Sequence, residues 1–214
     1  MVDLATGEIL FEFSKDFEGG CFFLRLSWSP DGRYFVTPCS NLPRADTWDA
    51  ETGEHVKTLL HADGVNPAAW SPDGTRILTA DLTGVVHVWN AESGDLLFDF
   101  RGHTSAVYDA AWSQNGNYIA SGDDTGTVRI WDAKSGQEVN VYHVGFGILG
   151  VSWSPDSTQI ITSGFYVIPD IRRVWQSTDE LIAYAKACCV FRDLTPEERQ
   201  QFGLPPRSDL PSKN

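Results

Sequence analysis

The chain has 214 residues and a formal net charge of −13, with 29 acidic side chains against 16 basic ones. Nucleic acids and anionic membrane surfaces are bound through Lys and Arg, so we expect neither as a partner. The absence of a run of about 18 apolar residues and of a basic N-terminal signal region predicts a cytoplasmic protein. None of the four cysteines forms a Cys-x-x-Cys pair, which predicts free thiols in a reducing compartment.

Residues 1–13 match the end of a unit that recurs later in the chain. Val2–Gly7 aligns with Trp48–Gly53, with Val2 in place of the tryptophan. The alternation of apolar and polar residues over 8–13 predicts a strand, the first outer strand of the fold. The chain therefore begins partway through a unit.

Four full units follow, each with two tryptophans at fixed places. Equivalent tryptophans recur about every 42 residues, a period typical of four-stranded propeller blades. The first tryptophan of each unit precedes a tight turn of the type Ser-Pro-Asp-Gly, and short β-type runs separated by such turns predict an antiparallel meander. The units extend over about 20–60, 61–100, 101–142 and 143–176; their tryptophans are Trp28 and Trp48, Trp70 and Trp89, Trp112 and Trp131, and Trp153 and Trp175.

The dipeptides Trp48-Asp49 and Trp131-Asp132 and the pair Gly102-His103 add a more specific signature. With the repeat, they make residues 1–176 resemble WD-repeat β-propellers. The resemblance implies an all-β fold of four propeller blades. Blades of seven- or eight-bladed rings subtend about 45–51° each, so we expect a partial (half) ring. Either a second copy, giving an eight-bladed homodimer, or upstream sequence would complete it.

In WD-repeat blades a His, a Ser or Thr, an Asp and a Trp form a buried hydrogen-bond network. The resemblance implies such a structural network in two units. The usual Asp positions hold Thr83 and Thr125, and whether Asp123 or Asp124 replaces the missing acid is left open. The predicted network residues are His61, Thr79, Trp89, His103, Ser121 and Trp131.

The resemblance also implies that partners bind at the propeller rim. The fourth unit has an irregular loop there with Phe165 and Tyr166, large side chains of the kind that form interface hot spots. The predicted partner-binding residues are Asp81, Leu82, Asp123, Asp124, Phe165 and Tyr166.

From Ser177 the apolar period changes to that of helices, and capping signals predict two short helices over 177–203. The Pro- and Ser-rich stretch 204–214 is expected to be disordered. Residues 181–198 are similar to the C-terminal end of long bacterial WD-repeat proteins, many of them signal-transduction ATPases. That similarity implies that the natural C-terminus is present and an N-terminal part is missing.

The chain has no P-loop, no His-x-x-x-His metal pair and no nucleophile elbow, so we expect no cofactor, no metal and no enzymatic activity. The leading hypothesis is a non-catalytic protein–protein interaction scaffold, the C-terminal sensor or platform of a larger bacterial signalling protein. The alternative is an enzyme that uses the central channel of an assembled propeller. For it the inner strands offer Arg25, Tyr108 and Asp109 but no repeated acid–base set.

Overall fold

The computed structural model describes residues 20–22, 25–164, 169–174, 179–180 and 183. The chain divides into two units, Met1–Val174 and Trp175–Asn214. All of the strands belong to the first unit, and the fold is described for that unit alone.

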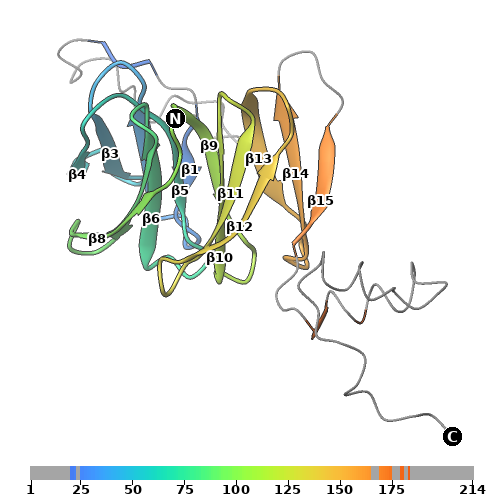
Figure 1. Cartoon of the computed structure of the whole chain (residues 1–214). Coiled ribbons are helices and arrows are strands. Elements are labelled where there is room, and N and C mark those ends of the chain that lie inside the picture. The colour runs from blue at the N-terminus through green and yellow to red at the C-terminus, as the bar shows by residue number, and fades with distance from the viewer. Residues whose placement is uncertain (1–19, 23–24, 165–168, 175–178, 181–182, 184–214) are drawn as a thin grey trace, which may run out of the picture. The chain divides into compact units, whose positions relative to one another are not determined.

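The first unit consists of four antiparallel sheets that follow one another along the chain (Figure 1). Each sheet is a meander in which consecutive strands pair, so its first and last strands form its two edges. Sheet 1 is β1 (Ser27–Trp28), β2 (Tyr34–Cys39), β3 (Arg44–Asp49) and β4 (His55–Leu60). Sheet 2 is β5 (Val65–Trp70), β6 (Arg76–Asp81), β7 (Val85–Asn90) and β8 (Leu96–Arg101). Sheet 3 is β9 (Val107–Trp112), β10 (Tyr118–Asp123), β11 (Thr127–Asp132) and β12 (Glu138–His143), and sheet 4 is β13 (Ile148–Trp153), β14 (Gln159–Gly164) and β15 (Asp170–Arg173).

The repeated Ser-Pro-Asp-Gly sequence closes the turn between the first two strands of a sheet. In sheet 1 the Asp31 carboxylate accepts hydrogen bonds from the Ser29 hydroxyl and the Arg33 N–H, at 2.6 and 3.1 Å. Gly32 has φ +72°, a left-handed conformation that glycine adopts at little cost. In sheet 4 the same place is taken by Ser157 with φ +59°. The turn chemistry that the sequence predicts is therefore present in the structure.

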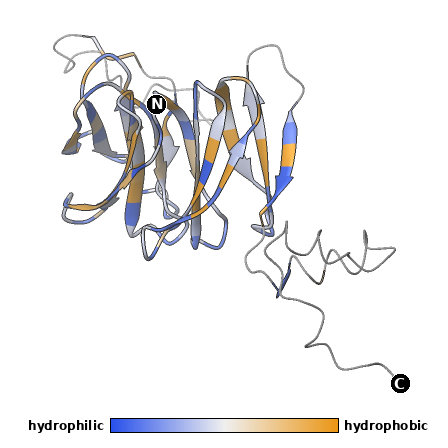
Figure 2. Cartoon of the chain, viewed as in Figure 1, coloured by the Kyte–Doolittle hydropathy of each residue, from blue (hydrophilic) through white to orange (hydrophobic). Residues whose placement is uncertain are grey.

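The core lies between neighbouring sheets, because each sheet is apolar on both faces. Leu78 and Val88 of sheet 2 are fully buried in one cluster with Val107 and Ile119 of sheet 3. Equivalent clusters join sheet 1 to sheet 2 and sheet 3 to sheet 4. Figure 2 shows apolar and polar bands alternating along many of the strands. An all-β fold of antiparallel sheets, consistent with propeller blades, is confirmed; the half ring stays a prediction.

Three sequence predictions fall wholly or largely outside the described residues. The strand at 8–13 and the disordered stretch 204–214 lie wholly outside them. Of the helical tail at 177–203, the structure describes only Asp179, Glu180 and Ala183, and no helix is among its elements. The tail is therefore not supported as a structural element.

The cysteines require a correction. Cys21 and Cys39 form a disulfide, with their Cα atoms 5.3 Å apart, whereas the sequence analysis expected free thiols. Side-chain bonds of Asn41 to the backbone of Gly20 and Phe22 hold the same segment beside the end of β2. The two cysteines are 18 residues apart, so no short sequence motif predicts that they form a disulfide. The cysteines no longer argue for a reducing compartment, and cytoplasmic localisation stays a prediction on other grounds.

Candidate functional site

The candidate site is built on two equivalent turns, each between the second and third strands of a sheet. In sheet 2, Oδ1 of Asp81 accepts hydrogen bonds from the N–H and hydroxyl of Thr83 and from the N–H of Val85, at 3.0, 2.6 and 3.2 Å. In sheet 3, Asp123 binds Thr125 and Thr127 in the same way. One carboxylate thus organises each turn from within.

This geometry changes the interpretation of the predicted partner-binding residues. Asp81 and Asp123 are buried, with 0% and 1% of their surface exposed, so they hold the turns and do not face a partner. The next residues, Leu82 and Asp124, are half-buried and exposed respectively, and their role in partner binding stays a prediction. Phe165 and Tyr166 lie outside the described residues.

Sheet 3 contains a buried chain of hydrogen bonds that starts at the turn. Nδ1 of His103 lies 2.8 Å from the Asp123 carboxylate and Nε2 lies 2.7 Å from the Ser121 hydroxyl. The indole N–H of Trp131 donates to the same hydroxyl at 2.9 Å. Because a carboxylate only accepts, Nδ1 carries the proton and Nε2 accepts from Ser121. The acid that the sequence left undecided is therefore Asp123, and Asp124 is exposed.

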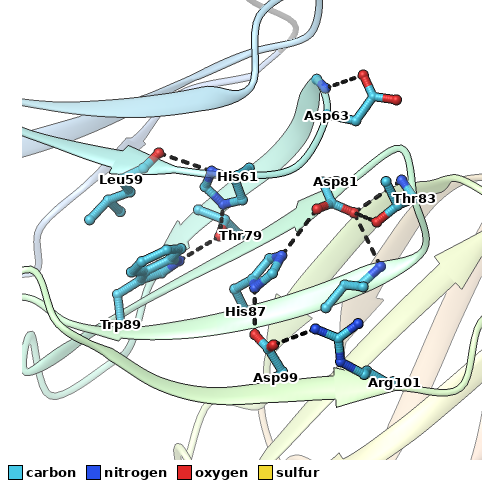
Figure 3. A network of polar contacts seen from close by, with 12 residues as sticks. Leu59, His61, Asp63, Thr79, Asp81, Thr83, His87, Trp89, Asp99 and Arg101 are labelled. Carbon is cyan, nitrogen blue, oxygen red and sulfur yellow. Dashed lines mark hydrogen bonds and ion pairs between the residues drawn. The ribbon is translucent and has the colours of Figure 1, made fainter.

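Sheet 2 has a different arrangement around its own histidine (Figure 3). Nε2 of His61 lies 2.7 Å from the Thr79 hydroxyl, to which Trp89 donates at 2.7 Å. Nδ1 of His61 lies 2.9 Å from the carbonyl oxygen of Leu59, so it donates to the backbone and no acid takes part at that nitrogen. The structure thus brings together the predicted residues of sheet 2.

The acid of sheet 2 is bound instead by His87, which the repeat pattern does not predict. Nε2 of His87 lies 3.2 Å from Asp81 and Nδ1 lies 2.7 Å from Asp99, which also pairs with Arg101 at 2.7 Å (Figure 3). A neutral imidazole has one N–H and can donate to one of these carboxylates, whereas an imidazolium donates to both. His87 occupies the place that Asp46 and Arg129 take in sheets 1 and 3. Because the equivalent residue differs from sheet to sheet, the repeat pattern does not predict a histidine at this position.

Burial and neighbouring side chains shift the pKa values of His61, Asp81 and His103. Burial, followed by the nearby His87, lowers the pKa of His61 to about 4. Burial acts to raise the pKa of Asp81, but hydrogen bonds from His87, Thr83 and Val85 lower it to about 2. Burial likewise lowers the pKa of His103, against the effect of Asp123. At neutral pH His61 and His103 are therefore neutral, and Asp81 is ionised.

The first strands carry the residues that a channel enzyme would use. A guanidinium nitrogen of Arg25 lies 2.7 Å from the Asp109 carboxylate, although Arg25 lies just before β1 of sheet 1 and Asp109 lies in β9 of sheet 3. The same carboxylate oxygen accepts the Val151 N–H at 2.7 Å. Burial raises the pKa of Asp109, against the effects of Val151 and Arg25. Tyr108, the neighbour of Asp109, is partly exposed.

The described part of the chain contains neither a metal-binding cluster nor a helix that could span a membrane. No group of three or more His, Cys, Asp or Glu side chains there is arranged to hold a metal ion. No helix there is long and apolar enough to span a membrane.

Comparison with known proteins places this geometry in a class. The family profile described as "WD domain, G-beta repeat" matches residues 53–90 and 94–132. The chain is 32% identical over 73 residues to "Periodic tryptophan protein 2 homolog" of Dictyostelium discoideum. It is 34% identical over 58 residues to "Angio-associated migratory cell protein" of Canis lupus familiaris and 31% identical over 85 residues to "Telomerase protein component 1" of Rattus norvegicus.

These matches cover 34%, 27% and 37% of this chain, but only 8%, 13% and 3% of the three relatives. The sheets and their turns define a β-propeller-like repeat fold. The profile and the relatives support, more particularly, a WD-repeat protein. WD repeats suggest a scaffold for protein interactions.

Proposed function

We propose that this chain is a non-catalytic scaffold that binds a protein partner on the face formed by the turns after β6 and β10. The observation that carries the proposal is the internal bonding of those turns. Asp81 and Asp123 hold each turn from inside, so that Leu82 and Asp124 occupy equivalent places next to them. A surface that is already ordered loses little conformational entropy on binding, which favours recognition.

Backbone bonds support the same surface. The N–H of Leu82 donates to the carbonyl oxygen of Gly64 at 2.9 Å, and the N–H of Asp124 donates to that of Ala106 at 3.2 Å. Each turn is therefore attached to the segment that enters its own sheet. Because the turns are fixed on both sides, partner binding depends on the side chains that they present.

The test is affinity capture from the native lysate with the wild-type chain and two variants. Leu82→Ser with Asp124→Lys changes the proposed face, and Glu51→Lys changes an exposed residue in the turn between β3 and β4. We expect the same specific proteins to be retained by the wild type and by Glu51→Lys, and lost from the double variant. Equal retention by the double variant would contradict the proposed face.

We further propose that a second copy packs on sheet 4 and completes the ring. Ile161 and Ile171 pair across β14 and β15 and are 40% and 61% exposed. Their equivalents in sheet 2, Leu78 and Val88, are fully buried against sheet 3. A sheet face of this type is apolar because another sheet normally covers it.

Light scattering on the purified chain tests this second proposal. We expect the wild type to have twice the mass of one chain and Ile171→Lys to have the mass of one chain. A wild-type monomer would support the other interpretation, in which further blades of a longer protein complete the ring. The assignment to a bacterial signalling protein rests on the resemblance of residues 181–198 alone.

The channel-enzyme alternative gains no support from the first strands. Arg25 and Asp109 form an ion pair, and the N–H of Val151 donates a further hydrogen bond to the carboxylate. Both donors stabilise the ionised carboxylate, but burial outweighs them and raises its pKa. The carboxylate is therefore engaged in structural contacts, and the sequences leading to the first tryptophans offer no repeated acid–base set beside it.

A further inference from the structure

The turn after β2 corresponds to the two turns of the proposed partner face, but it is held in a different way. β2 ends at Cys39, where β6 ends at Asp81 and β10 ends at Asp123. In sheets 2 and 3 this aspartate accepts hydrogen bonds from its own turn. In sheet 1 the residue at the same place is joined to Cys21 by a disulfide.

The disulfide connects the same two segments that a hydrogen bond connects in sheet 3. His103 lies in the segment that enters sheet 3, and its Nδ1 donates to Asp123 at the end of β10 over 2.8 Å. Cys21 lies in the segment that enters sheet 1, and it is bonded to Cys39 at the end of β2. A thiol reductant breaks the link in sheet 1 and leaves the link in sheet 3 intact.

The other bonds between the two segments of sheet 1 are exposed to solvent. The N–H and hydroxyl of Ser40 donate to the carbonyl oxygen of Phe22, at 3.1 and 3.0 Å. Asn41 accepts the Phe22 N–H at 2.8 Å and donates to the carbonyl oxygen of Gly20 at 2.6 Å. Phe22 itself is 70% exposed. Segments with exposed hydrogen bonds and few buried contacts open easily, so the disulfide is the main attachment here.

The turn after β2 also supports the next turn of the proposed partner face. A Cβ atom at Gly64 would collide with the carbonyl oxygen of Ser40 and would lie 3.2 Å from Cδ1 of Leu82. The carbonyl oxygen of Gly64 accepts the N–H of Leu82 at 2.9 Å. Because Ser40 directly follows Cys39, a change at the disulfide reaches Leu82 through Gly64.

The disulfide is accessible from one of its two sulfur atoms. Cys39 is fully buried, whereas Cys21 is half-buried. The thiolate of a dithiol attacks Sγ of Cys21, the S–S bond breaks, and Cys39 leaves as a thiolate that takes up a proton. The second thiol then closes a disulfide within the reagent and releases Cys21 as a thiol. The reduced Cys39 has an acceptor at hand, because Oδ1 of Asn41 lies 3.3 Å from its sulfur.

We propose that the Cys21–Cys39 disulfide is a redox switch for the partner face. In the oxidised state it fixes the turn after β2 and, through Gly64, supports Leu82. Reduction by a dithiol releases the turn and weakens partner binding. The effect on binding rests on the proposed function, whereas the change in the turn does not require a partner.

Amide hydrogen exchange of the full chain, followed by NMR with and without dithiothreitol, tests the switch. We expect reduction to speed the exchange of the Ser40 and Phe22 N–H groups about tenfold, and that of Leu82 severalfold. The N–H of Asp124 is an internal control, because it donates to Ala106 in sheet 3, where no disulfide is present. Unchanged exchange at Ser40 and Leu82, or an equal increase at Asp124, would overturn the proposal.

Two cysteine variants identify the source of the change. Cys21→Ser with Cys39→Ser should exchange like the reduced wild type, whether or not dithiothreitol is present. Cys188→Ser with Cys189→Ser keeps the disulfide and should respond to dithiothreitol as the wild type does. Exchange of the first variant at the rates of the oxidised wild type would show that the disulfide does not order the turn.

The effect on binding is measured with the proteins that the oxidised wild type captures from its native lysate. They are eluted and applied to the oxidised wild type and to the Cys21→Ser, Cys39→Ser variant, which we expect to retain severalfold less. Equal retention would overturn redox control of binding. Capture of no protein by the oxidised wild type would contradict the proposed function instead, and the exchange rates would then decide whether the disulfide controls the turn.

Discussion

At the residue scale, His61 and His103 take equivalent places but make different hydrogen bonds. His103 donates to the Asp123 carboxylate, whereas His61 donates to a backbone carbonyl. The difference follows from His87, which occupies the Asp81 carboxylate in sheet 2. The repeat therefore conserves the hydroxyl and the tryptophan of the network more closely than its acid.

The first prediction concerns the hydroxyl that joins histidine and tryptophan. Ser121→Ala removes the partner of both His103 Nε2 and Trp131 Nε1, which are buried. We expect the free energy of unfolding to fall by about 1–3 kcal/mol, the cost of unsatisfied buried polar groups. Urea unfolding measures it, with Ser93→Ala in an exposed turn as the control; an equal effect of both variants would contradict the role of the network.

The second prediction concerns pH. The pKa of His61 is lowered from 6.5 to about 4, so below pH 6.5 the unfolded chain binds a proton that the folded chain does not. This stabilising contribution is complete above pH 6.5 and is lost as the pH falls toward 4. By about pH 5 we expect a loss of roughly 2 kcal/mol from His61. The lowered pKa of His103 acts in the same direction.

Urea unfolding at about pH 7.5 and about pH 5 measures this loss. His61→Gln should show a smaller difference between the two conditions, because Gln keeps a polar group near Thr79 but does not titrate. The Asp81 contribution is lost only below its ordinary pKa of 3.8 and lies outside this range. An unchanged pH dependence in His61→Gln would show that the histidine is not the source.

At the element scale, the turns between the second and third strands closely approach the segments that lead into the following sheets. Gly126 has φ +86°, and a Cβ there would lie 2.6 Å from the carbonyl oxygen of Phe146. Gly84 is similar, with φ +91° and Ser105 as the neighbour. Glycine is therefore required for two reasons: the backbone has a positive φ, and the neighbouring backbone leaves no room for a Cβ atom.

The third prediction separates these two requirements. Gly145 has φ +80° but nothing within 4 Å of its Cβ position. Gly145→Ala should therefore cost about 1–2 kcal/mol, the strain of a left-handed alanine. Gly126→Ala should cost clearly more, since the backbone of Phe146 must also move. Thermal unfolding of the two variants tests this, and equal losses would contradict the close approach.

At the scale of the whole first unit, the Arg25–Asp109 pair connects sheets that are not neighbours in the chain. Arg25 and Asp109 each stand three residues before the first tryptophan of their unit, and Pro67 has that place in sheet 2, although Arg25 itself precedes β1. The side chain of Asp109 is 4% exposed and that of Arg25 58%. The pair therefore holds the segment that enters β1 against sheet 3, with one buried partner.

The fourth prediction is a double-mutant cycle on this pair. Arg25→Gln leaves a buried carboxylate with the Val151 N–H as its remaining donor, and we expect a loss of about 1–2 kcal/mol. Asp109→Asn should also destabilise the unit. In the double variant the losses should not add, and the difference should be about 1 kcal/mol because Arg25 is exposed. Additive losses in urea unfolding would show that the pair contributes nothing.

Part of the fold was predictable because it depends on local sequence. Turn residues such as Asp31 and Gly32 determine the backbone over four or five residues, and the regular spacing of the tryptophans carries this pattern along the chain. The pairs His61–Thr79 and His103–Ser121 were implied by the resemblance to WD-repeat blades. In contrast, the burial of Asp81 and Asp123 was not predicted. The sequence around an aspartate in a turn is the same whether its side chain faces solvent or the sheet.

The sequence by itself determined the repeat: meandering sheets, their turns and the apolar faces that must be covered, all of which depend on residues close together in the chain. The tertiary structure alone decided the partners, among them the Cys21–Cys39 disulfide and the contact of His87 with two carboxylates. The physical reason is that a side chain bonds to whatever the strand register and the neighbouring sheet bring within about 3 Å. That distance depends on segments tens of residues away.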